Sequence, residues 1–157
     1  MSETLKIAII GDYNFTYNAH HATNLALDHS ADFLALEPNY YWIKISDALK
    51  YKSAYFDQYD GIWIAPGPIE NPFYLTGIFK KLIENKIPVL NTGEGFKHFL
   101  EHLITFHQLT SFQEKLISEN LVAGNSFERL TIHPTSKAFK KLYQNFSNVE
   151  LTSSRYS

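Results

Sequence analysis

Short apolar runs, each followed by a turn and a helical pattern, constrain the fold of this 157-residue chain more than any other feature. Residues 5–10 are rich in aliphatic side chains and end at Gly11, and the run 62–65 ends as abruptly at Pro66. Such runs are typical of strands that are buried on both faces of a parallel sheet. The alternation therefore predicts an α/β fold in which right-handed crossovers place helices on both faces of a mostly parallel central sheet.

The pattern places most of its elements in the first two thirds of the chain. The predicted strands are 5–10, 40–45, 62–65 and 88–91, and the predicted helices are 19–35, 73–85 and 96–104. In the first helix, apolar side chains recur at helical spacing, at Ala22, Leu25, Ala26 and Phe33. A connector is expected at 46–61. Weaker signals follow, with strands at 115–122, 128–133 and 149–152 and a helix at 135–144. No linker or repeat interrupts the chain, so we expect one domain over 1–157.

Composition argues against several classes of protein. The formal charge is −2, with 14 Lys and Arg interspersed among 16 Asp and Glu, so the basic footprint of a nucleic-acid-binding protein is lacking. There is no apolar run of about 18 residues and no apolar signal region, which predicts a cytoplasmic protein without a membrane span. The absence of cysteine excludes disulfides, thiolate metal ligands and thiol catalysis. We expect no cofactor.

Three turns mark the edge of the sheet at which a site is expected. In open α/β sheets, ligands bind beyond the carboxyl ends of the strands, where the turns that follow residues 10, 64 and 90 lie. The predicted ligand-binding residues in and beside these turns are Gly11, Asp12, Tyr13, His20, His21, Gly67, Thr92 and Gly93. A simpler alternative stays open for some of them, because Asp12 can cap its loop and both histidines can lie on an exposed first helical turn.

The turn at 91–95 has the pattern of a nucleophile elbow. Its sequence, Asn-Thr-Gly-Glu-Gly, joins a strand to a helix through small residues. Such an elbow holds its central residue in a strained backbone above the helix N-terminus. The helix dipole and the free backbone N–H groups at this point favour a nucleophile.

Three segments, 6–13, 60–67 and 84–90, resemble the glutaminase domain of CTP synthases and their short stand-alone relatives, within the class I glutamine amidotransferases. The resemblance extends over about residues 5–104. It implies a three-layer sandwich of the flavodoxin-like or class I glutamine amidotransferase-like type. It also implies a cysteine nucleophile in the elbow, an oxyanion loop and a His-x-Glu pair near the C-terminus.

The catalytic groups that the resemblance implies are missing. Gly93 stands at the position of the cysteine, so no thioester can form there. Pro68 follows Gly67 in the segment that matches the oxyanion loop, and proline has no backbone N–H to donate. The last histidine, His133, is not followed by a glutamate two positions on. The resemblance therefore implies a pseudoenzyme without glutaminase activity that binds a small molecule or a partner protein. A homodimer stays open.

Glu94 and the histidines that follow it support an alternative function. A carboxylate is stabilised at a helix N-terminus, and Glu94 there can act as a cap, a plug or a replacement catalyst. The run from His98 through Glu101 to His102 fits the inverted zinc-protease pattern. The alternative is an enzyme of different chemistry, such as a hydrolase, in which Glu94 acts with His20, His21 or His98; the predicted catalytic residues are Glu94 and His98. Its metal-dependent version binds metal through His98 and His102. The simpler interpretation is a solvated helix face with local Glu–His contacts and no metal.

Overall fold

The computed structural model of the chain describes residues 4–108, 127–132 and 149–154. The contacts divide the chain into two compact units, Met1–Glu114 and Lys115–Ser157. No helix in the described ranges is both long and apolar enough to cross a membrane.

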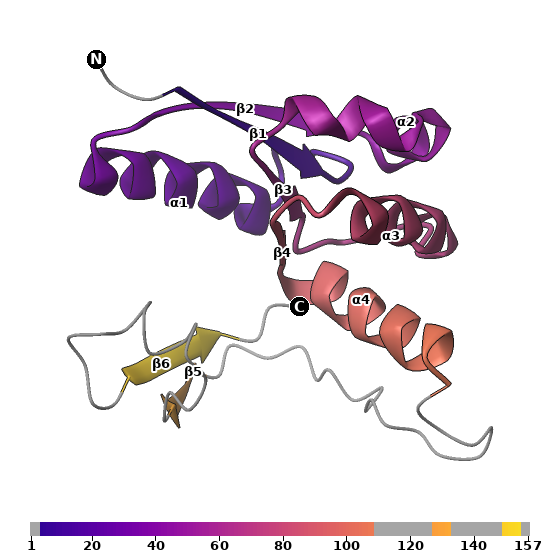
Figure 1. Cartoon of the computed structure of the whole chain (residues 1–157). Coiled ribbons are helices and arrows are strands. Elements are labelled where there is room, and N and C mark those ends of the chain that lie inside the picture. The colour runs from indigo at the N-terminus through magenta and orange to yellow at the C-terminus, as the bar shows by residue number, and fades with distance from the viewer. Residues whose placement is uncertain (1–3, 109–126, 133–148, 155–157) are drawn as a thin grey trace. The chain divides into compact units, whose positions relative to one another are not determined.

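Four parallel strands form the sheet of the first unit (Figure 1). They are β1 (Thr4–Ile10), β2 (Glu37–Ile43), β3 (Gly61–Ile64) and β4 (Val89–Asn91), in the order β2-β1-β3-β4. Ile10 is in register with Ile43 of β2 and Ile64 of β3, so the three strands end level. The strand order changes direction between β1 and β3, and this is the topological switch point at which open α/β sheets bind ligands. The predicted parallel α/β arrangement is confirmed.

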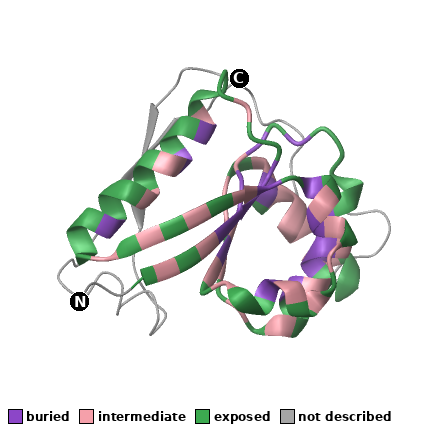
Figure 2. Cartoon of the chain, turned by 90° about the horizontal axis from the view of Figure 1, so that it is seen from above, coloured by how far each residue is buried: buried purple, intermediate pink, exposed green. Residues whose placement is uncertain are grey.

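Helices cover the sheet from both sides (Figures 1 and 2). Helix α1 (Asn18–Leu34) lies on one side, and α3 (Phe73–Asn85) and α4 (Gly93–Phe106) lie on the other. Helix α3 has its predicted bounds, whereas α4 begins earlier than predicted. The expected connector after β2 contains two helical segments, α2 (Ile45–Lys50) and the 3-10 helix η1 (Ser53–Gln58). The sequence did not reveal these segments, because one to two turns are too short to display helical periodicity.

The apolar core lies between the sheet and the helical segments α2, η1 and α3 (Figure 2). Helix α3 buries Leu75, Ile78, Phe79 and Leu82. By contrast, the buried residues of α1 are His20, Thr23 and Ala31, and its apolar residues at helical spacing are all exposed, namely Ala22, Leu25, Ala26 and Phe33. Phe33 is 89% exposed. Helix α1 is therefore attached to the sheet mainly by polar and small side chains.

The second unit contains an antiparallel pair of strands, β5 (Phe127–Ile132) and β6 (Val149–Ser154). The register pairs Phe127 with Ser154 and Ile132 with Val149. These strands agree with the predictions at 128–133 and 149–152. The strand predicted at 115–122 and the helix predicted at 135–144 lie outside the described residues, as does His133.

Candidate functional site at the carboxyl edge of the sheet

The structure brings the predicted turns together at the carboxyl edge, because they follow the neighbouring strands β1, β3 and β4. The closest approach is between Gly11 and Ala65, at the ends of β1 and β3. A Cβ atom on Gly11 would lie 2.5 Å from the Cβ of Ala65. Such a contact is too short for two carbon atoms, so the close approach of the two loops at the switch point requires a residue without a side chain.

His20 connects the β1–α1 loop to the β3–α3 loop. Its side chain is 1% exposed. Nδ1 accepts a hydrogen bond from the backbone N–H of Asn14 at 2.9 Å, and Nε2 lies 3.0 Å from the carbonyl oxygen of Gly67. Because Nδ1 is the acceptor, the proton is on Nε2, which donates to Gly67. Desolvation lowers the pKa of His20 below its ordinary value and outweighs the hydrogen bond to the carbonyl group of Gly67, which favours the imidazolium.

Aromatic rings surround the imidazole of His20. Tyr13 stacks on it with a centroid distance of 5.8 Å, and Trp42 of β2 lies at 5.0 Å. Tyr17 meets the imidazole edge-on at 5.5 Å. The indole N–H of Trp42 donates to Oδ1 of Asn24 in α1 at 2.9 Å. Tyr13 and Tyr17 are partly exposed, so the cluster has a buried inner part and an outer part that faces solvent.

The neighbouring histidine has different surroundings. His21 is exposed, and its Nε2 lies 2.7 Å from the carbonyl oxygen of Phe15. Asp12 is also exposed. The sequence left open whether His20 and His21 face the site or the solvent. In the structure, His20 is buried beside the loops of the carboxyl edge and His21 is exposed to solvent.

The turn at Gly93 has no room for a side chain. Gly93 has a φ of 53°, in the left-handed region that an elbow residue adopts. A Cβ atom on Gly93 would overlap the carbonyl oxygen of Pro66 and lie 2.9 Å from its Cα. The next N–H, of Glu94, donates to the same carbonyl at 2.7 Å. The position at which an elbow presents its nucleophile is therefore packed against the backbone of the β3–α3 loop.

The side chain of Glu94 lies across that loop. Its Oε2 accepts the backbone N–H of Ile69 at 2.8 Å. A Cβ atom added to Gly67 would lie 2.9 Å from the carboxyl carbon of Glu94, so the carboxyl group lies close to the Gly67 backbone. Since Pro68 has no N–H and the N–H of Ile69 donates to a carboxylate, neither residue has a backbone donor available to a ligand. Thr92, also a predicted ligand-binding residue, accepts the indole N–H of Trp63 at 2.8 Å.

The histidines of α4 do not converge on Glu94. Nδ1 of His98 lies 2.8 Å from Oε2 of Glu101. His102 is buried between Phe79 and Phe106, and its Nε2 has no hydrogen-bond partner. Burial lowers the pKa of His102, and the positive charge of Lys80 adds to this effect. Within the described part of the chain, no three His, Cys, Asp or Glu side chains are grouped so that they could hold a metal ion.

No family model and no curated protein matches the sequence. Among solved structures, the chain is similar to the glutaminase domain of a CTP synthase from Trypanosoma brucei, solved with bound acivicin. The TM-score is 0.68 at 14% identity, and the match covers 97% of this chain and 67% of that one. The chain has the fold of a class I glutamine amidotransferase domain. The predicted fold and its resemblance to the CTP synthase domain are thereby confirmed, and a shared fold does not by itself establish a shared function.

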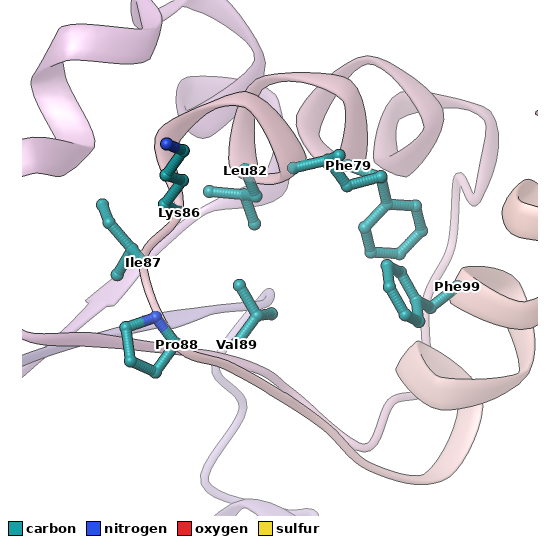
Figure 3. A pocket seen from close by; sticks show the side chains of 8 residues that line it. Phe79, Leu82, Lys86, Ile87, Pro88, Val89 and Phe99 are labelled. Atoms are coloured by element: carbon teal, nitrogen blue, oxygen red, sulfur yellow. The ribbon is translucent and has the colours of Figure 1, made fainter.

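In this amidotransferase-like fold, two apolar pockets lie away from the carboxyl edge. One, of about 300 Å³, is lined by α3, the connection into β4 and Phe99 of α4, with Lys86 as its charged residue (Figure 3). The other, of about 400 Å³, lies between α1 and the strands β3 and β4. No residue of the three turns lines either pocket. Neither of these two pockets is therefore the predicted site, which lies on the surface that the three loops form at the carboxyl edge.

Three residues that the sequence analysis did not single out complete this surface. Trp42 contributes its ring from β2, Pro66 contributes its carbonyl group, and Ile69 contributes its N–H. Backbone groups carry no residue-specific signal in a sequence. The one available hint was Gly93, whose missing side chain makes room for Pro66.

Proposed function

We propose that this chain is a pseudoenzyme of the amidotransferase fold, which does not hydrolyse glutamine and binds a partner through the carboxyl edge of its sheet. The observation that carries the proposal is the contact between Gly93 and Pro66. An acyl-enzyme mechanism needs a nucleophilic side chain at the elbow. Here the elbow residue has no side chain, and the neighbouring backbone fills the space that a side chain would need.

The β3–α3 loop supports the same conclusion. An oxyanion is stabilised by free backbone N–H groups that point at the developing charge. Pro68 has no such group, and that of Ile69 donates to Glu94. A carboxylate at this point would also repel an oxyanion. Glu94 is therefore assigned to holding the loop in place.

The exposed aromatic side chains of this edge favour a protein partner over a small molecule. Tyr13, Phe15 and Tyr17 belong to or adjoin the β1–α1 loop, and Phe73 begins α3 after the β3–α3 loop. Phe15 is 74% exposed. Exposed aromatic residues are enriched at protein interfaces, whereas small molecules bind in concave pockets, and the described pockets lie elsewhere.

Restoring a thiol at the elbow tests the loss of catalysis. Because the chain contains no cysteine, any thiol signal in Gly93→Cys comes from the elbow. We expect no ammonia release from glutamine by either protein, and a stability loss of about 1–3 kcal/mol for Gly93→Cys from overpacking and backbone strain. Gly61→Cys is the matched control, since a Cβ there would lie 3.9 Å from the nearest atom, the carbonyl oxygen of Pro88.

Ligand binding is measured in parallel by thermal unfolding. A ligand that binds the folded state raises Tm, and we expect no increase with glutamine or with acivicin, the ligand of the similar domain. Ammonia release by the wild-type protein that disappears in Glu94→Gln would refute the proposal and favour an enzyme of different chemistry. Its metal-dependent version requires zinc to raise Tm and His98→Ala to abolish the increase.

A further inference from the structure

The β1–α1 loop is organised around Asn14. Its side-chain oxygen accepts hydrogen bonds from the backbone N–H and the hydroxyl of Thr16 at 2.9 and 2.7 Å. Its carbonyl oxygen accepts the N–H of Tyr17 at 3.1 Å. The backbone N–H of Asn14 then donates to Nδ1 of His20. The Asn14–His20 hydrogen bond therefore connects a locally ordered loop to the buried imidazole at the switch point.

Protonation of His20 would act on one of its two hydrogen bonds. A neutral imidazole has a single acceptor nitrogen, and in imidazolium both nitrogens are donors. A proton on Nδ1 would point at the N–H of Asn14, 2.9 Å away, and two donors would then face each other. Nε2 would still donate to Gly67. The link to the β3–α3 loop is thus kept, while the link to the β1–α1 loop is lost.

Few charged groups surround His20 in the described residues. Asp12 of the β1–α1 loop favours the imidazolium, and His21 of α1 disfavours it. The other neighbours are the phenols of Tyr13 and Tyr17, the indole of Trp42 on β2 and the backbone of Gly67. Because the buried site lacks a paired carboxylate, protonation is opposed by burial and is completed only below neutral pH.

We propose that His20 is a pH-operated latch on the β1–α1 loop, and that protonation of Nδ1 releases Asn14 and with it the aromatic side chains of the partner-binding edge. The latch would weaken partner binding in mildly acidic conditions, because Tyr13, Phe15 and Tyr17 would no longer be held in one arrangement. This consequence rests on the proposed function, whereas the latch itself is independent of it.

The test is a pH titration of the ligand-free protein by NMR. Two-dimensional ¹H–¹⁵N spectra report the amide of Asn14, and long-range ¹H–¹⁵N spectra report the tautomer of each histidine. We expect His20 to be protonated on Nε2 at neutral pH and to titrate with a midpoint below about 6.5, the ordinary value for histidine. The Asn14 amide should shift with the same midpoint, while the Gly67 contact persists.

Two variants serve as controls. His20→Gln removes the titrating group, so the pH-dependent shift of Asn14 should disappear. His102→Gln removes the second histidine that is buried within residues 4–108 and should leave the shift unchanged. The latch is overturned if the wild-type Asn14 amide does not respond when His20 titrates, if the wild-type imidazole carries its neutral-state proton on Nδ1, or if the response persists in His20→Gln. The titration needs no binding partner. The latch can therefore be refuted while the proposed function stands, and the proposed function can be refuted while the latch stands.

Discussion

The two faces of the sheet carry helices that are attached by different interactions. On one face, α3 buries four large apolar side chains in the core. On the other, α1 buries His20, Thr23 and Ala31 and is connected by hydrogen bonds from His20 to Gly67 and from Trp42 to Asn24. Apolar burial is non-directional and independent of pH, whereas hydrogen bonds depend on direction and, where a partner such as His20 titrates, on pH. The β3–α3 loop is therefore stabilised by apolar packing on one side, through Ile69, and by a titratable group on the other, through the hydrogen bond from His20 to Gly67.

The largest expected effect distinguishes the two faces directly. Phe79→Ala removes a ring that is 1% exposed and packs on Phe99, and we expect it to lower the free energy of unfolding by about 3–5 kcal/mol. Phe33→Ala, on the outer side of α1, should change it by less than about 0.5 kcal/mol. Urea denaturation measures both. A loss of several kcal/mol for Phe33→Ala would show that the α1 face is covered in solution.

Substitutions of Glu94 test how α4 holds the β3–α3 loop in place. Glu94→Ala removes the acceptor of the Ile69 N–H, and we expect a loss of about 1.5–3 kcal/mol, typical of a hydrogen bond to a charged group. Glu94→Gln keeps an acceptor and should cost less. Glu70→Ala, an exposed carboxylate in the same loop, is the matched control and should be nearly neutral. Equal effects of Glu94→Ala and Glu70→Ala on the unfolding midpoint would contradict the assigned role.

Trp42 tests how α1 is attached. Trp42→Phe keeps an aromatic ring but loses the N–H that donates to Asn24, and we expect a loss of about 0.5–1.5 kcal/mol. A double-mutant cycle with Asn24→Ala isolates this bond, since residues in contact show non-additive effects. Strict additivity in thermal unfolding would mean that the bond does not stabilise the attachment of α1.

The smallest effect is the dependence of stability on pH. The folded-state pKa values of His20 and His102 are both lowered, so the unfolded chain binds more protons and stability rises with pH. This stabilisation is complete above about pH 6.5, the ordinary pKa of histidine, and is lost as the pH falls from there through the folded-state values. His20→Gln should reduce the slope of unfolding free energy against pH, and His20→Gln with His102→Gln should reduce it further. An unchanged slope in the double variant would contradict both lowered pKa values.

Much of the fold was predictable because its signals are local. Residues 5–10 identify a buried strand by composition alone, and α3 displays helical periodicity over its whole length from Phe73 to Asn85. The absence of a thiol from the turn at Gly93 can likewise be read from the sequence. In α1 the same kind of periodicity predicted a helix whose bounds are correct to about one residue. The regularly spaced apolar side chains of this helix are nevertheless exposed.

The site depended on contacts that are distant in the sequence. His20 and Gly67 are 47 positions apart, and nothing local distinguishes His20 from His21. Glu94 and Ile69 are 25 positions apart, and their contact uses a backbone N–H that every residue except proline has. The sequence by itself therefore determined the order of the four parallel strands and the three long helices, and the lack of a thiol at the elbow. Only the tertiary structure decided that Pro66 closes the elbow, that Glu94 holds the loop and that His20 is buried, because these depend on which turns the parallel sheet brings to one edge.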